Sequence, residues 1–411
     1  MELICALQQY SWGVKGKLSS VAQLAQASQV DVAIDDSTPY AELWMGTHPN
    51  GPSLIKGTKR LLSSYIQENP ECLGKIVTSK FGPNLPFLFK VLSVNQALSI
   101  QAHPNKSHAE ELHASRPDVY KDPNHKPEMT IALTPFLALC GFRPQQEIVQ
   151  FFQGSVVGRA AAEEFSTAPS ASTLQACFSG LMRASKDVVE EALVGLEKRL
   201  LAMGTEDADR LHASTFLKTL SQYPGDGGCF ALYLLNLIEL QPGQAMFLGP
   251  NVIHAYLHGD CVECMACSDN VVRAGLTPKY QDVDTLIAML EYQMSDAHSR
   301  IFKPTKLDAS CELFNPPVPD FAVEAIKASN LCTSSSLFMV ASGKCYSVRS
   351  VDSCSLLLVV QGAASVTASS PAMPAPPASV VRGSVLFLPA NYSITVEPSQ
   401  DLVAFRALCE P

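Results

Sequence analysis

Four segments of the sequence bring together histidines and other polar residues that could perform chemistry. In the first segment, Ser99, Gln101 and His103 alternate along the chain directly after an apolar run. Alternate side chains of a β-strand share one face, so these three would point the same way. A glutamine oxygen and a histidine nitrogen on one face could bind a divalent metal. A strand end whose polar residues enter a loop would give the same local pattern.

The second segment pairs a lysine with a glutamate. Lys126 and Glu128 alternate onto one side of the chain, just before the apolar run that starts at Thr130. The pair could form a plain salt bridge. It could also be a metal-ligating carboxylate with an amine beside it, which the metal would help to hold neutral for use as a base.

The third segment, residues 249–256, carries His254 and Tyr256 on one face. A histidine flanked by apolar residues is commonly a satisfied core residue and not a ligand. However, three segments that each present polar residues on one face favour a single shared site.

Three cysteines open the fourth segment, residues 259–279. Cys261, Cys264 and Cys267 have the C-x-x-C-x-x-C spacing of iron–sulfur or zinc–thiolate sites. Residues three apart on a strand point to opposite faces, and no nearby fourth cysteine completes the set. We therefore reject a cysteine-bound metal here.

The same segment supplies two cations, Arg273 and Lys279, around a Gly-Leu-Thr-Pro sequence. They could be solvated surface charges or the positive wall of a pocket. The chain has 30 basic and 39 acidic residues, a net charge of −9, and no basic block offsets it. This balance disfavours nucleic acid and anionic membranes as partners. An anionic substrate would therefore need positive charge concentrated in one place.

Short strands are the main elements that would position these residues. Apolar runs punctuated by Pro, Gly and Asn predict strands within residues 87–94, 98–101 and 130–141, and strand character resumes at Gln244. Between them, residues 147–220 have helical composition. The pattern indicates a helical insertion between two parts of a β-rich domain.

One apolar helix face is predicted within this helical stretch, ended by Gly204, and it comprises Leu181, Val188, Ala192, Leu196 and Leu200. A Gly-Asp-Gly-Gly sequence at residues 225–228 then breaks the chain before the next apolar run.

A weak internal repeat links the third segment to the C-terminal region. Gly243 precedes an apolar run and Pro250, with His254 four residues after the proline, and Gly383 precedes a similar run and Pro389. Such a pattern is typical of cupin-type jelly rolls, whose barrels bind metals on the inner face. Ser393 stands where the second copy would have its histidine, which predicts a barrel without metal.

In this order, the four segments resemble type I phosphomannose isomerases. The resemblance rests on Gln-Ala-His-Pro-Asn-Lys (residues 101–106), Asn-His-Lys-Pro-Glu-Met (124–129) and the long stretch 260–280, with a further match at 41–49. It covers the chain broadly and is least distinctive past residue 300.

The resemblance implies one Zn²⁺ per chain, held by Gln101, His103, Glu128 and His254. It also implies that Arg273 is essential. The remaining implied site residues are Lys126 and His125 for proton handling, Tyr256, Glu263, Asp269 and Lys279 in the pocket, and Ser99 and Lys90 at the phosphate end of the substrate.

The fold implied is mainly β with an α insertion, namely two cupin-like jelly-roll barrels plus a helical domain. We expect a discontinuous catalytic cupin domain over residues 1–146 and 229–297. A helical insertion would cover 147–228, and a C-terminal cupin-like domain without metal would cover 298–411.

The activity implied is the reversible isomerisation of mannose 6-phosphate and fructose 6-phosphate through an enediolate, supplying mannose 6-phosphate for GDP-mannose and glycosylation. We expect Lys126 to act as the base and His125 to assist ring opening, with Glu263 as the rival base. The alternatives are another metal-dependent aldose–ketose isomerase acting on a hexose 6-phosphate, a non-haem iron cupin oxygenase, and a non-catalytic sugar-binding cupin.

The setting that we expect is a cytoplasmic monomer with a small-molecule sugar phosphate substrate. The 13 cysteines are scattered, and the first 15 residues lack the pattern of a secretory signal. Both observations favour a reducing compartment with free thiols.

Overall fold

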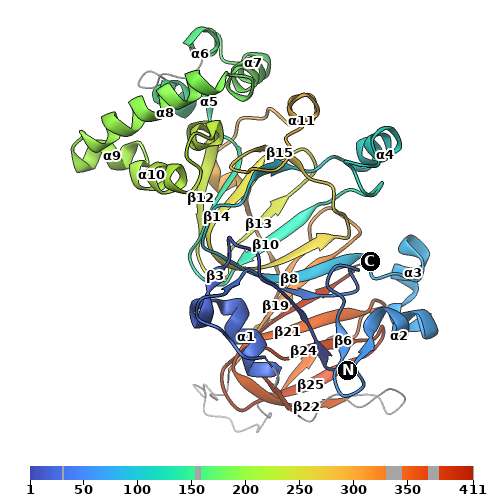
Figure 1. Cartoon of the computed structure of the whole chain (residues 1–411). Helices are drawn as coiled ribbons and strands as arrows, with labels where there is room; N and C mark the ends of the chain where they lie inside the picture. Colours follow the sequence, from blue (N-terminus) through green and yellow to red (C-terminus); the bar gives the residue numbers. More distant parts are fainter. Residues whose placement is uncertain (30–31, 153–158, 330–344, 369–378, 411) are drawn as a thin grey trace.

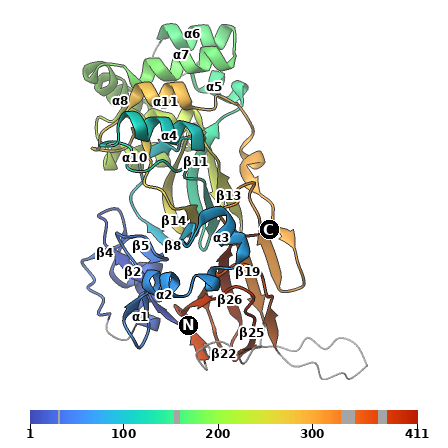
Figure 2. The same cartoon turned by 90° about the vertical axis from the view of Figure 1, so that its right-hand side faces the viewer.

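Three regions follow one another along the molecule. The computed structural model describes the chain except for residues 30–31, 153–158, 330–344, 369–378 and 411. A group of helices lies at one end, the C-terminal strands lie at the other, and a large sheet lies between them (Figure 1); Figure 2 shows the same order after a quarter turn. The architecture is thus mixed α/β, with antiparallel sheets and a helical insertion. None of the described helices combines the length and apolar character that crossing a bilayer requires.

The middle region is an 11-stranded sheet whose longest strand is β14 (His254–Ala266). β14 pairs antiparallel with four other strands, so it forms the spine of the sheet. The other strands of this sheet are β2 (Ala6–Gln8), β5 (Glu42–Met45), β8 (Phe87–Val94), β9 (Ile100–Ala102), β10 (Glu128–Ala132), β11 (Phe136–Phe142), β12 (Leu235–Leu240), β13 (Ala245–Leu248), β15 (Val272–Gly275) and β16 (Ile301–Phe302).

The strand register brings distant polar residues together. Gln101 lies opposite both His254 on β14 and Arg273 on β15, while Glu263 lies opposite Lys90 on β8. The predicted strand 87–94 matches β8. The predicted run 130–141 instead forms two strands, β10 and β11, because the chain turns at residues 133–135.

The helical region contains α5 (Gln145–Phe152), α6 (Arg159–Thr167), α7 (Ala171–Met182), α8 (Lys186–Leu201), α9 (Thr205–Arg210) and α10 (Ala213–Gln222). The single predicted helix face is wrong in two respects. Leu181 belongs to α7, and Val188 is 53% exposed while its neighbour Val189 is buried on α8. The chain breaks at residues 183–185, and Val189, three residues before Ala192, continues the buried stripe. Gly204 caps the start of α9 and does not close α8.

The C-terminal region has two antiparallel sheets. The larger contains β17 (Thr305–Lys306), β18 (Cys311–Phe314), β19 (Ala322–Ala328), β21 (Ser355–Gln361), β24 (Val385–Leu388) and β26 (Leu402–Leu408). The smaller contains β20 (Tyr346–Val348), β22 (Ala363–Ala368), β23 (Ser379–Val381) and β25 (Ile394–Pro398). Aliphatic residues of both sheets form one core cluster.

The internal repeat is also visible in the backbone geometry. This geometry shifts the counterpart of His254 by one residue from the position that the sequence predicted. Asn251 and Asn391 both adopt positive φ, of 64° and 61°, and each lies three residues after the end of its strand, β13 or β24. The next strands begin three residues later, at His254 and Ile394. The counterpart of His254 is therefore Ile394, a fully buried aliphatic residue, and not Ser393.

Smaller elements complete the chain: β1 (Leu3–Ile4), β3 (Val14–Lys15), β4 (Pro39–Tyr40), β6 (Leu54–Ile55), β7 (Arg60–Leu61), α1 (Ser20–Ser28), α2 (Leu62–Glu68), α3 (Lys75–Phe81), α4 (Lys106–Ser115), α11 (Val283–Met289) and the 3₁₀ turns η1 (Gly16–Leu18), η2 (Pro70–Leu73), η3 (Gly227–Tyr233) and η4 (Ala297–Arg300). The amino group of Met1 donates to the carbonyl of Phe387 at 2.9 Å. The first and last parts of the chain therefore lie side by side.

Asp282 ties α11 to the chain that follows α4. Its carboxylate caps α11 by accepting from Thr285 N at 3.2 Å, accepts from Tyr120 OH at 2.7 Å, and pairs with Arg116. Burial alone would raise the pKa of Asp282, but the hydrogen bonds from Tyr120, Thr285 and Arg116 hold this pKa below its usual value. Its stabilisation is therefore present above about pH 4 and is lost as the pH falls through the lowered pKa.

Replacing Asp282 with alanine is expected to lower the free energy of unfolding by about 3 kcal/mol, since a helix cap and two charge-assisted hydrogen bonds are lost together. Urea denaturation measures the change. Asp284→Ala in the same helix is the matched control, because its carboxylate is 87% exposed and a surface pair contributes little. Equal destabilisation by the two variants would contradict this account.

Candidate active site

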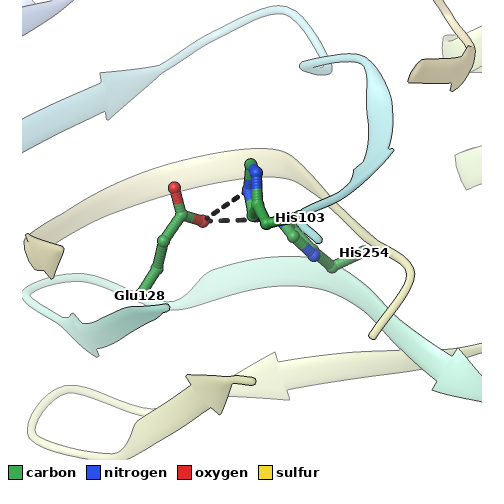
Figure 3. Close-up of side chains that lie close together, drawn as sticks. All are labelled: His103, Glu128 and His254. Carbon is green, nitrogen blue, oxygen red and sulfur yellow. Dashed lines mark ion pairs between the residues drawn. The ribbon is translucent and has the colours of Figure 1, made fainter. Parts of the chain in front are cut away.

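Two histidines and a glutamate meet at one buried point of the central sheet. His103 follows β9, Glu128 begins β10 and His254 begins β14, and Figure 3 shows the three side chains converging. Glu128 Oε2 lies 3.5 Å from His103 Nε2 and 3.4 Å from His254 Nε2. Within the described residues, no other group of three His, Cys, Asp or Glu side chains is close enough to hold a metal ion.

The far side of each imidazole is held by a backbone carbonyl. His103 Nδ1 lies 2.7 Å from Asn270 O, and His254 Nδ1 lies 2.8 Å from Val252 O. A carbonyl only accepts, so we infer that each Nδ1 carries the proton and that each Nε2 presents a lone pair to the cluster. Burial lowers the pKa of His103 to about 4, which keeps this imidazole neutral.

Two atoms of this cluster have no hydrogen-bond partner in the described part of the chain, His103 Nε2 and Glu128 Oε2. Buried polar atoms are rarely left unsatisfied. A cation between them would satisfy both, which makes the cluster a candidate metal centre.

Gln101 stands next to this cluster. Its amide nitrogen lies 3.5 Å from His254 Nε2, and its amide oxygen accepts from Ser99 Oγ at 3.3 Å. Rotation of the amide would exchange the two atoms, since they are nearly alike in shape. Gln101 is therefore within reach of the cluster, with its nitrogen turned toward His254 in this structure.

Lysines and carboxylates surround the cluster in two buried pairs. Lys126 Nζ lies 3.1 Å from Glu128 Oε1, and Lys90 Nζ lies 3.2 Å from Glu263 Oε2. Burial would raise the pKa of Glu128, but Lys126 and His103 outweigh it and hold this pKa well below its usual value. Burial raises the pKa of Glu263 despite the neighbouring Lys90. The pKa values of the two carboxyl groups are thus shifted in opposite directions, an arrangement that acid–base sites often use.

Lys90 makes more contacts with charged and aromatic side chains than the sequence suggested. Besides Glu263, its ammonium approaches Glu42 Oε2 at 3.9 Å and lies over the ring of Trp44. Burial opposes its charge, but Glu42 and Glu263 overcome this and raise the pKa of Lys90. Two carboxylates thus compensate the charge of Lys90, which also lines the cavity, and its contact with a phosphate stays a prediction.

A cavity of ≈ 950 Å³ opens beside these groups. Its lining includes Lys90, Ser99, Gln101, Lys126, Glu128, Tyr256, Glu263, Asp269, Arg273 and Lys279. Arg273 is half-buried, and burial alone lowers its pKa, since no charged side chain in the described part of the chain offsets it. The cavity therefore contains a cation that is available to bind an anion. This cation lies on β15, opposite Gln101 on β9.

Comparison with known proteins identifies the family. The model of the type I phosphomannose isomerase catalytic domain matches residues 1–145, and that of the family's helical insertion domain matches residues 150–235. The chain belongs to the type I phosphomannose isomerases. The resemblance found in the sequence is thereby confirmed.

Relatives in this family match over nearly the whole chain. The mannose-6-phosphate isomerase of Homo sapiens is 48% identical over 99% of this chain and 98% of its own, and that of Schizosaccharomyces pombe is 38% identical over 99% of both. Among solved structures, the apo mannose 6-phosphate isomerase from Salmonella typhimurium has a TM-score of 0.84 at 33% identity. A zinc-bound holo mannose 6-phosphate isomerase has a TM-score of 0.83 at 32% identity. Each structural match covers 100% of this chain and 99% of the other.

Of the residues predicted for catalysis or substrate binding in this phosphomannose isomerase, His125 does not line the cavity. The predicted ligands His103 and His254 are buried and are not part of the lining either. His125 Nε2 faces Asp320 Oδ2 at 3.0 Å, an aspartate just before β19 in the C-terminal region. The imidazole thus links two regions of the chain, and the expected role of His125 in ring opening stays a prediction.

The phosphomannose isomerase site also contains residues for which the sequence suggested no role. His48 Nε2 lies 3.5 Å from Asp269 Oδ1, and this hydrogen bond holds the pKa of Asp269 below its usual value. Glu42 and Trp44 on β5 line the same cavity. The alternation of Glu42, Trp44 and the nearby His48 was a usable signal, since polar and aromatic side chains on one strand face are unusual in an otherwise apolar segment.

The three spaced cysteines do not form a cluster in this family member. Cys261 and Cys264 on β14 are buried in different core clusters, as their spacing predicts. All of the cysteines described are free thiols.

Proposed function

We propose that this chain interconverts mannose 6-phosphate and fructose 6-phosphate, with one Zn²⁺ held by Gln101, His103, Glu128 and His254. The observation that carries the proposal is the buried His-Glu-His cluster, with its unsatisfied Nε2 and Oε2 atoms, whose Glu128 lines the same cavity as Arg273. Relatives named mannose-6-phosphate isomerase, and a related structure described as zinc bound, support it.

The donor set suits zinc. Two neutral imidazoles, one carboxylate and one amide are borderline and hard ligands of the kind that Zn²⁺ accepts. Their formal charge with Zn²⁺ is 2 − 1 = +1, and an ion of that net charge would polarise a sugar carbonyl when bound. The carbonyl partners of His103 and His254 would hold the two imidazoles in the orientation that binding needs.

The phosphate of the substrate belongs beside Ser99 and Lys279 in this proposal. Arg273 is free of carboxylates, and Lys279 is exposed on the turn that follows β15. Ser99 Oγ lies on the same wall, next to Gln101. The cavity is also lined by the carboxylates of Glu42, Glu263 and Asp269, which would repel a phosphate placed next to them.

Lys126 is our proposed base, and Glu263 remains its rival. Lys126 Nζ lies 3.1 Å from a carboxylate of the metal cluster and lines the cavity, so a sugar bound at the metal would lie beside it. Glu263 accepts from Tyr256 OH at 2.8 Å and pairs with Lys90, which restricts its approach. Arg273 would hold the negative charge that develops when the proton leaves.

Exchange of the C2 proton with solvent separates the two candidates. Lys126→Ala should slow exchange by about a hundredfold or more, as loss of a general base does. Glu263→Gln keeps the shape of the side chain and should slow it much less. Near-normal exchange in Lys126→Ala would overturn this assignment.

The finer architecture is also part of the proposal. We infer two cupin-like barrels, over residues 1–146 with 229–297 and over 298–411, with the helical insertion over 147–228. The matching positive-φ asparagines support the repeat. The interior of the second unit is lined by aliphatic residues, with Ile394 at the position of His254, which supports a second barrel without metal. We further propose a cytoplasmic monomer.

Substrate identity is tested by assaying purified chain with mannose 6-phosphate, glucose 6-phosphate and unphosphorylated mannose. The ketose product, fructose 6-phosphate from the first two and fructose from the third, is followed by chromatography. Mannose 6-phosphate should be strongly preferred. A preference for glucose 6-phosphate would favour the other hexose 6-phosphate isomerase. Oxygen consumption would indicate an oxygenase, and no turnover in zinc-loaded protein would indicate a sugar-binding cupin.

A further inference from the structure

The Gly-Asp-Gly-Gly sequence at residues 225–228 contains a carboxylate, Asp226, that connects two segments of the chain. Asp226 lies between α10 and η3, and both oxygens of its carboxylate accept backbone hydrogen bonds. Oδ1 accepts from Gly228 N at 2.7 Å, and Oδ2 accepts from Thr277 N at 3.2 Å. One side chain therefore joins the end of the helical region to the turn that follows β15.

The two segments that Asp226 joins touch at the level of their backbones. A Cβ atom on Gly275 would lie 2.8 Å from the Cα of Gly228, and one on Gly228 would lie 2.8 Å from Leu276 N. Real Cβ atoms do not approach so closely, so both positions require glycine. The backbones of Gly228 and of residues 275–276 therefore pack in direct contact.

The turn beyond this contact is strained. Leu276 has φ of 53° while its side chain is only 1% exposed. The left-handed region is unfavourable for a residue other than glycine, and such strain persists only where the surroundings enforce it. Here the side chain is held in the core cluster of the helical region, and the next amide, Thr277 N, is held by Asp226.

This turn forms one wall of the catalytic cavity. Leu276, Thr277, Pro278 and Lys279 all line it, as does Asp226. Lys279 N donates to Thr277 Oγ1 at 3.1 Å, so the backbone that carries Lys279 depends on the position of Thr277. The carboxylate of Asp226 accepts from the amides of Gly228 and Thr277, which lessens its repulsion of an anion in the cavity.

The same helical segment also holds the chain just before Ser99. Gln222 Oε1 accepts from Ala97 N at 3.0 Å, and Tyr223 OH donates to Ala97 O at 2.5 Å. Ala97 lies two residues before Ser99. The end of α10 thus touches both loops that would surround the phosphate.

We propose that Asp226 is a positioning residue that fixes the turn of residues 276–279 and thereby sets Lys279 at the phosphate end of the site. This inference rests on the proposed function. In this proposal, the helical insertion contributes to phosphate recognition by positioning the backbone of the turn. No side chain of the helices binds the phosphate itself.

Asp226→Ser is the informative variant, because serine can still cap η3 by accepting from Gly228 N but is too short to reach Thr277 N. The KM for mannose 6-phosphate should rise about tenfold, the loss expected for one charge-assisted hydrogen bond. The kcat should change less than about threefold, and the zinc content should stay at one per chain. Calorimetry with inorganic phosphate should show the same weakening.

A double-mutant cycle with Lys279→Ala tests the route of this effect. If Asp226 acts through the turn, Asp226→Ser should add little to the rise in KM that Lys279→Ala causes, because interacting residues are not additive. Asp209→Asn on the exposed face of α9 is the control and should leave KM unchanged. Asp226→Asn, which keeps one oxygen for Gly228 N, provides the same test if the serine variant does not fold.

An unchanged KM in Asp226→Ser, or full additivity with Lys279→Ala, would overturn the proposal. So would an equal fall in kcat with loss of zinc, since that indicates general damage. If the wild-type chain does not turn over mannose 6-phosphate, the proposed function has failed. The phosphate titration then decides the role of Asp226 alone: equal affinity in wild type and Asp226→Ser would contradict it.

Discussion

Replacing Glu128 with glutamine is expected to remove zinc and to lower turnover of mannose 6-phosphate by about a thousandfold or more. Glu128 is the one negative ligand in the proposed set, and its Oε2 lies within 3.5 Å of both histidine Nε2 atoms. Glutamine keeps the size of the side chain but cannot compensate the charge of the ion. It would also leave Lys126 without its carboxylate partner.

The measurement is elemental analysis together with kcat on protein purified under identical conditions. Glu239→Gln is the matched control, since Glu239 lies on β12 with an exposed side chain. That variant should keep one zinc per chain and full activity. Full zinc content and activity in Glu128→Gln would show that this carboxylate is not a ligand.

Replacing Arg273 with alanine is expected to lower kcat/KM by about a thousandfold while zinc stays bound, because the variant loses a fixed cation at the developing charge. Arg273 lies opposite Gln101 in the sheet, lines the cavity and meets no charged partner in the described part of the chain. A half-buried guanidinium without a counter-ion is costly unless it meets an anion during function.

Arg273→Lys extends this test. Lysine restores a positive charge but not the planar fork that can hold two oxygens, so it should recover only part of the loss. Arg210→Ala is the control, because Arg210 makes only exposed ion pairs on α9. Activity near that of wild type in Arg273→Ala, with zinc present, would contradict the role given to this residue.

Local pattern predicted some of the contacts around the site, while the proposed ligand set came from the family resemblance. Alternation on strands correctly brought Lys126 next to Glu128 and directed Cys261 and Cys264 into different cores. These features depend on the two-residue period of a strand, which a sequence displays directly. Helical spacing was less reliable: Val188 and Val189 are adjacent valines, and only packing against the rest of the region decides which is buried.

Contacts between distant segments were beyond the reach of local pattern. His125 turns to Asp320, 195 residues away, and Asp226 binds the amide of Thr277, 51 residues away. The neutralisation of Lys90 likewise depends on a sheet register that brings Glu42 and Glu263 to its two sides. Such partners are chosen by tertiary packing, so a sequence identifies the chemical groups but not the pairs that they form.

The most direct test of the central claim is a zinc titration of chelator-treated, metal-free chain with mannose 6-phosphate as substrate. We expect no turnover without metal and a linear recovery of activity that reaches its plateau at one zinc per chain. Full activity in the metal-free chain would contradict the account. So would a chain that binds one zinc at the His103, Glu128 and His254 cluster and still produces no fructose 6-phosphate.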